Sequence, residues 1–257
     1  MTDPMRVLRA LNSSQQHLGA LVKSLEAADL ERATSEHGWS VAEVMGHLGS
    51  QAEIFTLFVD AGLNGSEPPS NEAFGPIWDA WNAKSPEAKA SDALAADATF
   101  LKHVESLGAD QLAHFELSIF GMDVDAAKLL GMRLGEHALH SWDVEVVFDE
   151  EAVLAADATE LLVDGLGTLV SRVGKPEDEP QSISIITSSP ERRFILDTGA
   201  VSLEPGEAAA GSPRLELSSE ALIRLVYGRL DVRHLGVPAP KAGSIELDRL
   251  RAIFPGV

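Results

Sequence analysis

The sequence predicts a two-domain α+β protein, with a four-helix bundle over residues 1–150 and a small α+β domain with an antiparallel sheet over residues 151–257. The chain has 257 residues, more than a single domain of roughly 100–150 residues usually contains. Apolar residues recur at helical spacing through the first half, whereas short period-two segments occur only in the second half. The pattern changes after the acidic run at residues 149–151, which we take as the domain boundary.

Capping signals mark the first two helices. Asp3 is followed by a proline, which favours a helix start there, and leucines at helical spacing extend this helix to about Leu25. Ser40 and Glu43 form a capping box, and Trp39 before them is placed to pack onto the first turn. The second helix is therefore expected to begin after Ser40 and to end near Gly62.

The rest of the first half supplies two more helices. Residues 63–90 are rich in Gly, Pro, Ser and Asn, which is typical of a long connection. A third helix is expected over residues 91–107, and the alternation in residues 114–120 indicates a short extended segment or a loop. A fourth helix is expected from Asp123 or Asp125 to about residue 147. Four amphipathic helices with one long connection are typical of a four-helix bundle.

The second half predicts a helix, a sheet and a last helix. The first helix is expected over residues 153–173 and the last over residues 219–229, before a Gly/Pro-rich tail. Between them, four short segments alternate apolar and polar residues and are separated by turn residues, so we expect an antiparallel sheet. The expected strands lie around residues 183–185, 194–196, 201–203 and 215–217.

Composition excludes several classes of function. With 20 basic and 40 acidic residues the net charge is −20, which repels nucleic acid and anionic membrane surfaces. No apolar run is long enough for a membrane span and no signal peptide opens the sequence, so we expect a cytoplasmic protein. The chain has no cysteine, so any metal site must use His, Asp and Glu, and any thiol chemistry must use an external thiol.

One face of the predicted fourth helix carries a cluster of polar residues. Arg133, Glu136, His140 and Asp143 lie at offsets of 0, 3, 7 and 10 and therefore share one side of the helix. His137 points about a quarter-turn away from this face. On the second helix, His47 lies on the side expected to face the interior of the bundle.

These residues predict a metal site. A lone inward histidine is usually an ordinary core residue, but a buried carboxylate such as Glu136 is costly unless it is paired or bound to a metal. His47, Glu136 and His140 would supply three ligands and leave an open position, as in catalytic zinc sites. Asp143 either holds His140 from behind or is a solvated residue near the helix end. The H-E-x-x-H order of zinc proteases is absent.

The motifs resemble a known family. Trp39-Ser40 with His47-Leu48, followed by Arg133-x-x-Glu136-x-x-x-His140-x-x-Asp143, is similar to the DinB-like metal-binding bundles, and within them to the mycothiol-dependent maleylpyruvate isomerase family. The resemblance implies a C-terminal domain similar to sterol-carrier folds. It implies that His47, Glu136 and His140 bind zinc (or another divalent metal such as nickel or manganese), and that Arg229 binds an acidic substrate. Alternatively, Arg229 only stabilises the end of its helix, and Arg224 is the lesser candidate.

The implied function is a reaction that uses mycothiol, a low-molecular-weight thiol, as nucleophile. The thiol would add to a small electrophile, which is expected to be anionic, and the result would be either isomerisation or S-transfer. Two alternatives stay open at this point: a metal-binding protein without turnover, such as a sensor or accessory factor, and a hydrolase that uses a zinc-bound water. Nothing in the sequence distinguishes a monomer from a homodimer.

Overall fold

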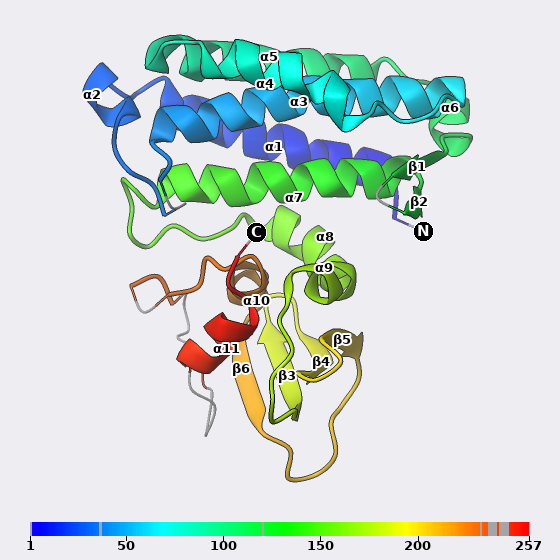
Figure 1. The fold of residues 1–257 in the computed structure, drawn as a ribbon, viewed down its shortest axis with the longest axis vertical. Coiled ribbons are helices and arrows are strands. Elements are labelled where there is room, and N and C mark those ends of the chain that lie inside the picture. Colours follow the sequence, from blue (N-terminus) through cyan, green and yellow to red (C-terminus); the bar gives the residue numbers. More distant parts are fainter. Residues whose placement is uncertain are drawn as a thin grey trace. The chain divides into compact units, whose positions relative to one another are not determined.

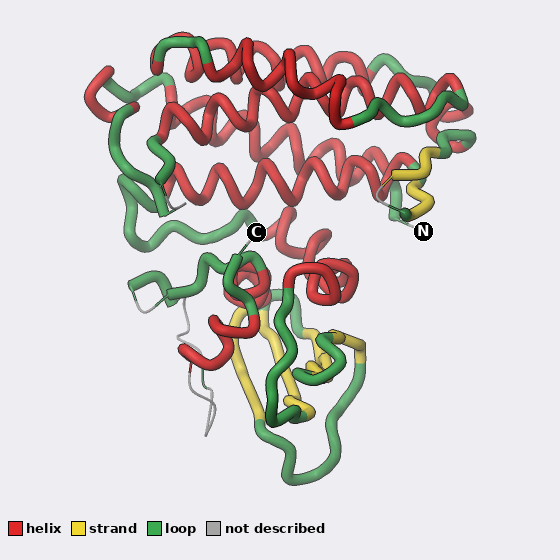
Figure 2. The backbone as a smooth tube through the Cα atoms, in the orientation of Figure 1, coloured by secondary structure: helices red, strands yellow, loops and turns green. Residues whose placement is uncertain are grey.

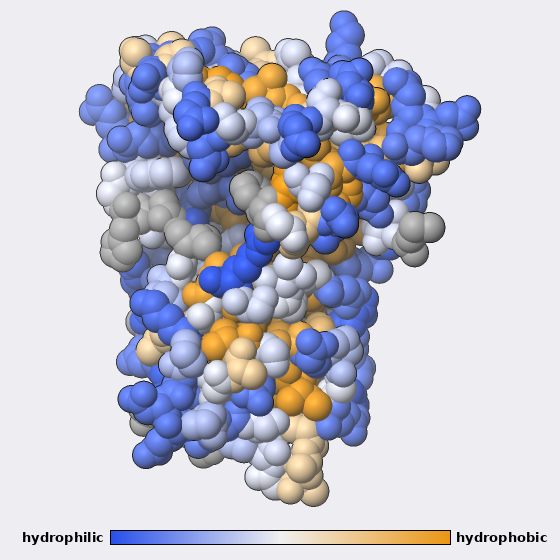
Figure 3. All heavy atoms as spheres, turned by 45° about the vertical axis from the view of Figure 1, so that its right-hand side comes forward, coloured by the Kyte–Doolittle hydropathy of each residue, from blue (hydrophilic) through white to orange (hydrophobic). Residues whose placement is uncertain are grey.

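The structure is a computed structural model that describes residues 2–35, 38–119, 121–231, 233–235, 241 and 247–256. The chain divides into two compact units, Met1–Asp149 and Glu150–Val257. Among the described helices, none combines the length and apolar character that a membrane crossing requires. The visible faces of both units are largely hydrophilic with scattered apolar patches (Figure 3), in keeping with the large excess of acidic residues.

Four long helices form the first unit, and they lie alongside one another (Figure 1). They are α1 (Pro4–Val22), α3 (Val41–Asn64), α5 (Pro86–Glu105) and α7 (Ala126–Glu145). Helix α3 packs chiefly against α5, and α1 packs chiefly against α7. The predicted helical bundle is therefore confirmed. The unit also contains α2 (Ala27–Leu30), α4 (Asn71–Asn82), α6 (Ala109–Ala113) and a hairpin of β1 (Leu117–Ile119) with β2 (Met122–Val124).

The capping signals correctly located the starts of three of these helices. The Asp3 side chain accepts a hydrogen bond from Met5 N at 3.0 Å. The Ser40 backbone N–H donates to Glu43 Oε2 at 2.7 Å while the Ser40 hydroxyl accepts from Glu43 N at 3.3 Å, which completes the capping box. Asp125 accepts from Lys128 N at 2.8 Å and opens α7. Helix α1 ends at Val22, slightly before the expected Leu25.

The long connection predicted over residues 63–90 was wrong in part. It contains α4, and α5 begins at Pro86 because Ser85 caps its first turn by accepting from Ala88 N. Helix α4 escaped prediction because Pro76 and Gly75 lie inside it and read as breakers. Its apolar residues Phe74 and Trp81 are buried at helical spacing, and this was the signal that could have identified it.

The second unit combines helices with one four-stranded sheet (Figure 2). The sheet has the order β5-β4-β3-β6. Strands β3, β4 and β5 pair antiparallel, as expected, but β6 runs parallel to β3, so the sheet is mixed. The strands are β3 (Ser182–Ser188), β4 (Arg192–Asp197), β5 (Ser202–Pro205) and β6 (Arg214–Ser218).

Two helical predictions in this unit need correction. The single helix expected over residues 153–173 is interrupted, because a 3₁₀ turn separates α8 from α9. The tail contains α11, although most of the Gly/Pro-rich stretch lies outside the described residues. The helices are α8 (Ala156–Leu162), the turn η1 (Val163–Gly165), α9 (Leu166–Val173), α10 (Ser219–Val226) and α11 (Leu247–Ile253).

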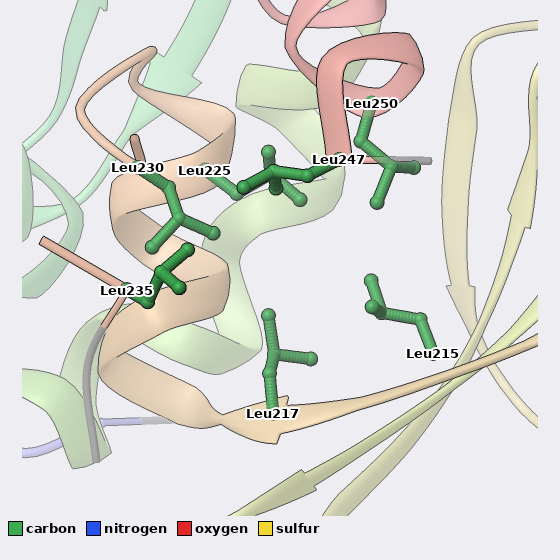
Figure 4. A pocket seen from close by; sticks show the side chains of 7 residues that line it. All are labelled: Leu215, Leu217, Leu225, Leu230, Leu235, Leu247 and Leu250. Atoms are coloured by element: carbon green, nitrogen blue, oxygen red, sulfur yellow. The ribbon is translucent and has the colours of Figure 1, made fainter. Parts of the chain in front are cut away.

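A cavity of about 160 Å³ in this unit is lined by leucine side chains that converge from β6, α10, α11 and the segment after α10 (Figure 4). The lining residues are Leu215, Leu217, Leu225, Leu230, Leu235, Leu247 and Leu250. None of them carries a polar, charged or metal-binding side chain, so this cavity supplies no chemistry of its own.

Candidate metal centre

His47 on α3 and Glu136 and His140 on α7 come together in the first unit. The ligating atoms of the three side chains all lie within 4.8 Å of one another. Nε2 of His47 lies 3.4 Å from Glu136 Oε2, and Nε2 of His140 lies 3.8 Å from the same oxygen. Two imidazole nitrogens and a carboxylate oxygen thus converge on one point, and this donor set fits a divalent metal such as zinc.

The three side chains are only partly shielded from solvent. His47 and Glu136 are 23% and 36% exposed in their side chains, whereas His140 is 11% exposed. A small molecule can therefore reach the cluster through the sides where His47 and Glu136 are accessible. A closed structural site would be expected to bury all of its ligands.

The protonation states at the site suit metal binding. Burial lowers the pKa of His47 below its ordinary value, although the hydrogen bond to Glu136 opposes this shift. Burial alone would raise the pKa of Glu136, but the hydrogen bond from His47 and the nearby charge of His140 outweigh it, so the pKa is lowered. A neutral imidazole and an ionised carboxylate are the forms in which these groups bind metal ions.

Asp143 fixes the orientation of His140. Its side chain is fully buried, and its Oδ2 lies 3.0 Å from His140 Nδ1. Ser35 donates a hydrogen bond to the other carboxylate oxygen of Asp143 at 2.6 Å. When Nδ1 of His140 donates to this carboxylate, the ring is oriented with Nε2 toward the cluster. Of the two expectations for Asp143, the structure therefore favours the one in which it holds His140.

Trp39 packs against both imidazole rings. Its ring centroid lies 5.0 Å from that of His47 and 5.8 Å from that of His140, with the latter pair stacked. The two imidazoles are themselves 4.6 Å apart, edge to face. Trp39 belongs to the apolar packing at the start of α3, as its position next to the capping box indicated. Its contact with the two histidines could not be predicted, since it depends on the approach of α7.

His137 and Arg133 belong to a separate buried network. Nδ1 of His137 lies 2.8 Å from the Ser14 hydroxyl, and its Nε2 lies 3.3 Å from an oxygen of Asp97. Arg133 donates to Asp97 Oδ1 at 2.5 Å and to the Leu48 carbonyl at 3.0 Å. The expectation that His137 points away from the cluster agrees with this geometry. Asp97 was missed entirely, because no spacing on α5 distinguishes it from other acidic residues.

Arg224 and Arg229, the two arginines considered as substrate-binding candidates, lie in the second unit. Arg224 is buried, donates through Nε to Glu220 at 2.7 Å and also contacts the carbonyl of His234, so its guanidinium is engaged inside the unit. Arg229 is partly exposed, and its Nη1 donates to the Tyr227 carbonyl at 2.8 Å. It follows Gly228, whose φ of 75° favours glycine.

Comparison with known proteins adds the following. Residues 11–145 match the family described as the mycothiol maleylpyruvate isomerase N-terminal domain. A comparison with curated protein sequences finds no match. The crystal structure of the mycothiol-dependent maleylpyruvate isomerase is similar, with a TM-score of 0.70, 16% identity and 95% of each chain covered. That of a histidine-to-alanine mutant of this isomerase has a TM-score of 0.66, 18% identity, and coverage of 93% of this chain and 97% of that one. At such identity the likeness shows the fold.

Proposed function

The chain belongs to the family of the mycothiol maleylpyruvate isomerase N-terminal domain, and on this premise we propose that it is a metal-dependent enzyme that uses mycothiol as a nucleophile. The observation that carries the proposal is the convergence of His47, Glu136 and His140 within 4.8 Å inside the matched segment. The proposed reaction is isomerisation of a maleylpyruvate-type substrate or S-transfer to another small electrophile.

In this proposal the three side chains hold one zinc ion, or nickel or manganese in its place, and leave a position open for the thiol. A metal bound there supplies the positive charge that ionises a coordinated thiol at neutral pH. The chain contributes no sulfur of its own beyond methionine, since it has no cysteine. Asp143 contacts Nδ1 of His140 and so orients Nε2 toward the cluster, and Trp39 holds both imidazole rings in place by packing against them.

The chemistry proceeds from the thiolate. Its sulfur forms a C–S bond to an activated C=C carbon, and the electron pair of the double bond moves onto the neighbouring carbonyl. Rotation about the resulting single bond, followed by return of the electron pair and loss of the thiolate, gives the isomer. If the adduct is protonated on carbon and released instead, the outcome is S-transfer.

Thiol binding can be tested directly on cobalt-substituted protein. Adding mycothiol should produce an intense sulfur-to-cobalt charge-transfer band in the near ultraviolet, because three protein ligands leave a position open for sulfur. His140→Ala protein treated in the same way provides the control and should show no such band. A spectrum of the native chain that stays unchanged at saturating thiol would favour a metal-binding protein without turnover.

Arg229 is proposed to bind the acidic substrate. Its guanidinium keeps its charge at any working pH and can bind a carboxylate through two hydrogen bonds. Arg229→Ala is expected to keep the metal content and lose most of the activity on an anionic substrate, with partial recovery in Arg229→Lys. The control is Arg233→Ala, which removes an exposed arginine paired with Asp231. Equal activity of the two alanine variants would contradict this role.

A further inference from the structure

A pocket of about 290 Å³ opens beside His47 within the first unit. One wall is a single face of α3, because Glu43, Gly46, His47 and Ser50 recur at helical spacing. Helices α4 and α5 and the residue before Ser40 supply the remaining walls. Their lining side chains are Trp39, Trp78, Trp81, Asn82 and Lys89.

The tryptophans make flat walls of different rigidity. Trp81 is 3% exposed, and its indole N–H donates to Glu53 at 2.9 Å, which fixes the ring. Its ring lies against the α3 backbone at Gly49, where an added Cβ would come within 2.1 Å of it. Trp78 is 42% exposed, and its ring contacts Phe74 edge to face at 5.8 Å between centroids. Flat apolar walls of this kind suit a planar conjugated molecule.

Lys89 is the one residue with a permanent positive charge among those that line the pocket. Its aliphatic stem lies over Gly46, since a Cβ there would meet Lys89 Cδ at 3.1 Å and Cγ at 3.3 Å. The stem of Lys89 therefore packs on α3 at the residue that directly precedes His47. Glu43 also lines the pocket. Its carboxylate accepts hydrogen bonds from the N–H and hydroxyl of Ser40 at the helix start, and these bonds, with a smaller effect of the Lys89 charge, lower the pKa of Glu43.

A strongly acidic chain needs a local cation to attract an anionic substrate, and the arginine on the same face of α7 as Glu136 and His140 is engaged elsewhere. Arg133 is fully buried and is bound to Asp97 and to the Leu48 carbonyl. We infer that the pocket binds the electrophilic substrate as a small planar carboxylate, with Lys89 contacting one carboxylate group of the substrate and the tryptophans covering the conjugated system. This inference rests on the proposed function. The volume is at the lower end of the roughly 300–1,000 Å³ of ligand pockets, which favours the small electrophile over the larger thiol.

Binding can be measured without turnover. Maleate is titrated into the full chain as purified, and binding is followed by calorimetry and by tryptophan fluorescence. Lys89→Gln is expected to weaken maleate binding about tenfold or more, because it removes a charge-assisted contact. Lys89→Arg should retain most of the affinity. The matched control is Lys84→Gln, since Lys84 lies 4.0 Å from the Trp81 ring centroid and is paired with Asp92 at 2.6 Å, yet does not line the pocket.

The outcomes separate this inference from the proposed function. Saturable maleate binding that is weakened by Lys89→Gln and unchanged by Lys84→Gln supports it. Absence of maleate binding, or equal loss in both variants, overturns it even if the cobalt–thiol band is present. A Lys89→Gln variant that binds maleate normally but mycothiol weakly also overturns it, because the pocket would then hold the thiol. Loss of the cobalt–thiol band with maleate binding intact would instead refute the proposed function.

Discussion

Replacing His140 with alanine is expected to abolish stoichiometric zinc binding, whereas replacing His137 is expected to leave it intact. The two residues are three positions apart on α7, but only His140 contributes to the cluster with His47 and Glu136. Removing a residue that only hydrogen-bonds to a metal ligand typically lowers metal affinity about 10–100-fold. Removing a ligand itself should therefore lower zinc affinity at least about 100-fold. Elemental analysis and zinc titration of the purified variants measure the effect.

His137→Ala, although it should keep its zinc, is expected to lower the stability of the fold. His137 is fully buried, and its ring contacts the hydroxyls of Ser14 and Ser141 at 2.8 and 3.1 Å. His137→Ala leaves these groups without that partner and should cost about 1–3 kcal/mol of unfolding free energy. A His137→Ala variant that folds but binds no zinc, together with a His140→Ala variant that binds it normally, would contradict the assignment of the ligands.

Spacing within one helix made most of the site predictable. Glu136 and His140 are separated by four residues, and Asp143 follows three residues later, so a helix alone places them on one face. Adding His47 to the predicted site required only one further inference, namely that His47 lies on the side of α3 that faces the interior of the bundle. Asp143 could be assigned a role only from its contact with His140 in the structure, because a residue near a helix end is as often solvated as buried.

The parts that escaped prediction depend on contacts between distant segments. Ser35, Asp97 and Lys89 reach the site or its surroundings from outside the two motif helices, and nothing in their local sequence marks them. The parallel pairing of β6 with β3 is a choice of topology that alternation of apolar and polar residues leaves open. Arg133 shares a helix face with Glu136 in the sequence, but the structure shows that it contacts α3 and α5.

The Arg133–Asp97 pair is expected to give the largest stability effect in the chain. Arg133 is 0% and Asp97 2% exposed in the side chain. Burial alone would raise the pKa of Asp97, but the charge of Arg133, together with His137 and the hydrogen bonds from both residues, outweighs burial and lowers it, so the carboxylate is ionised. Arg133→Met would leave this charge buried without its partner, which costs on the order of 3–5 kcal/mol. Since domains are typically stable by only about 5–15 kcal/mol, the first unit should be close to unfolding.

The measurement can be confined to the relevant unit, because all four tryptophans, at positions 39, 78, 81 and 142, lie in the first unit. Denaturant unfolding followed by tryptophan fluorescence therefore reports on the bundle alone.

The double variant Arg133→Met/Asp97→Leu should recover most of the lost stability, since it removes both buried charges and replaces them with apolar side chains of comparable size. Lys84→Gln serves as the control, because its pair with Asp92 is partly exposed to solvent and should contribute little to stability. If the double variant is no more stable than Arg133→Met, the cost comes from lost packing and from the lost contact to the Leu48 carbonyl rather than from an unpaired buried charge.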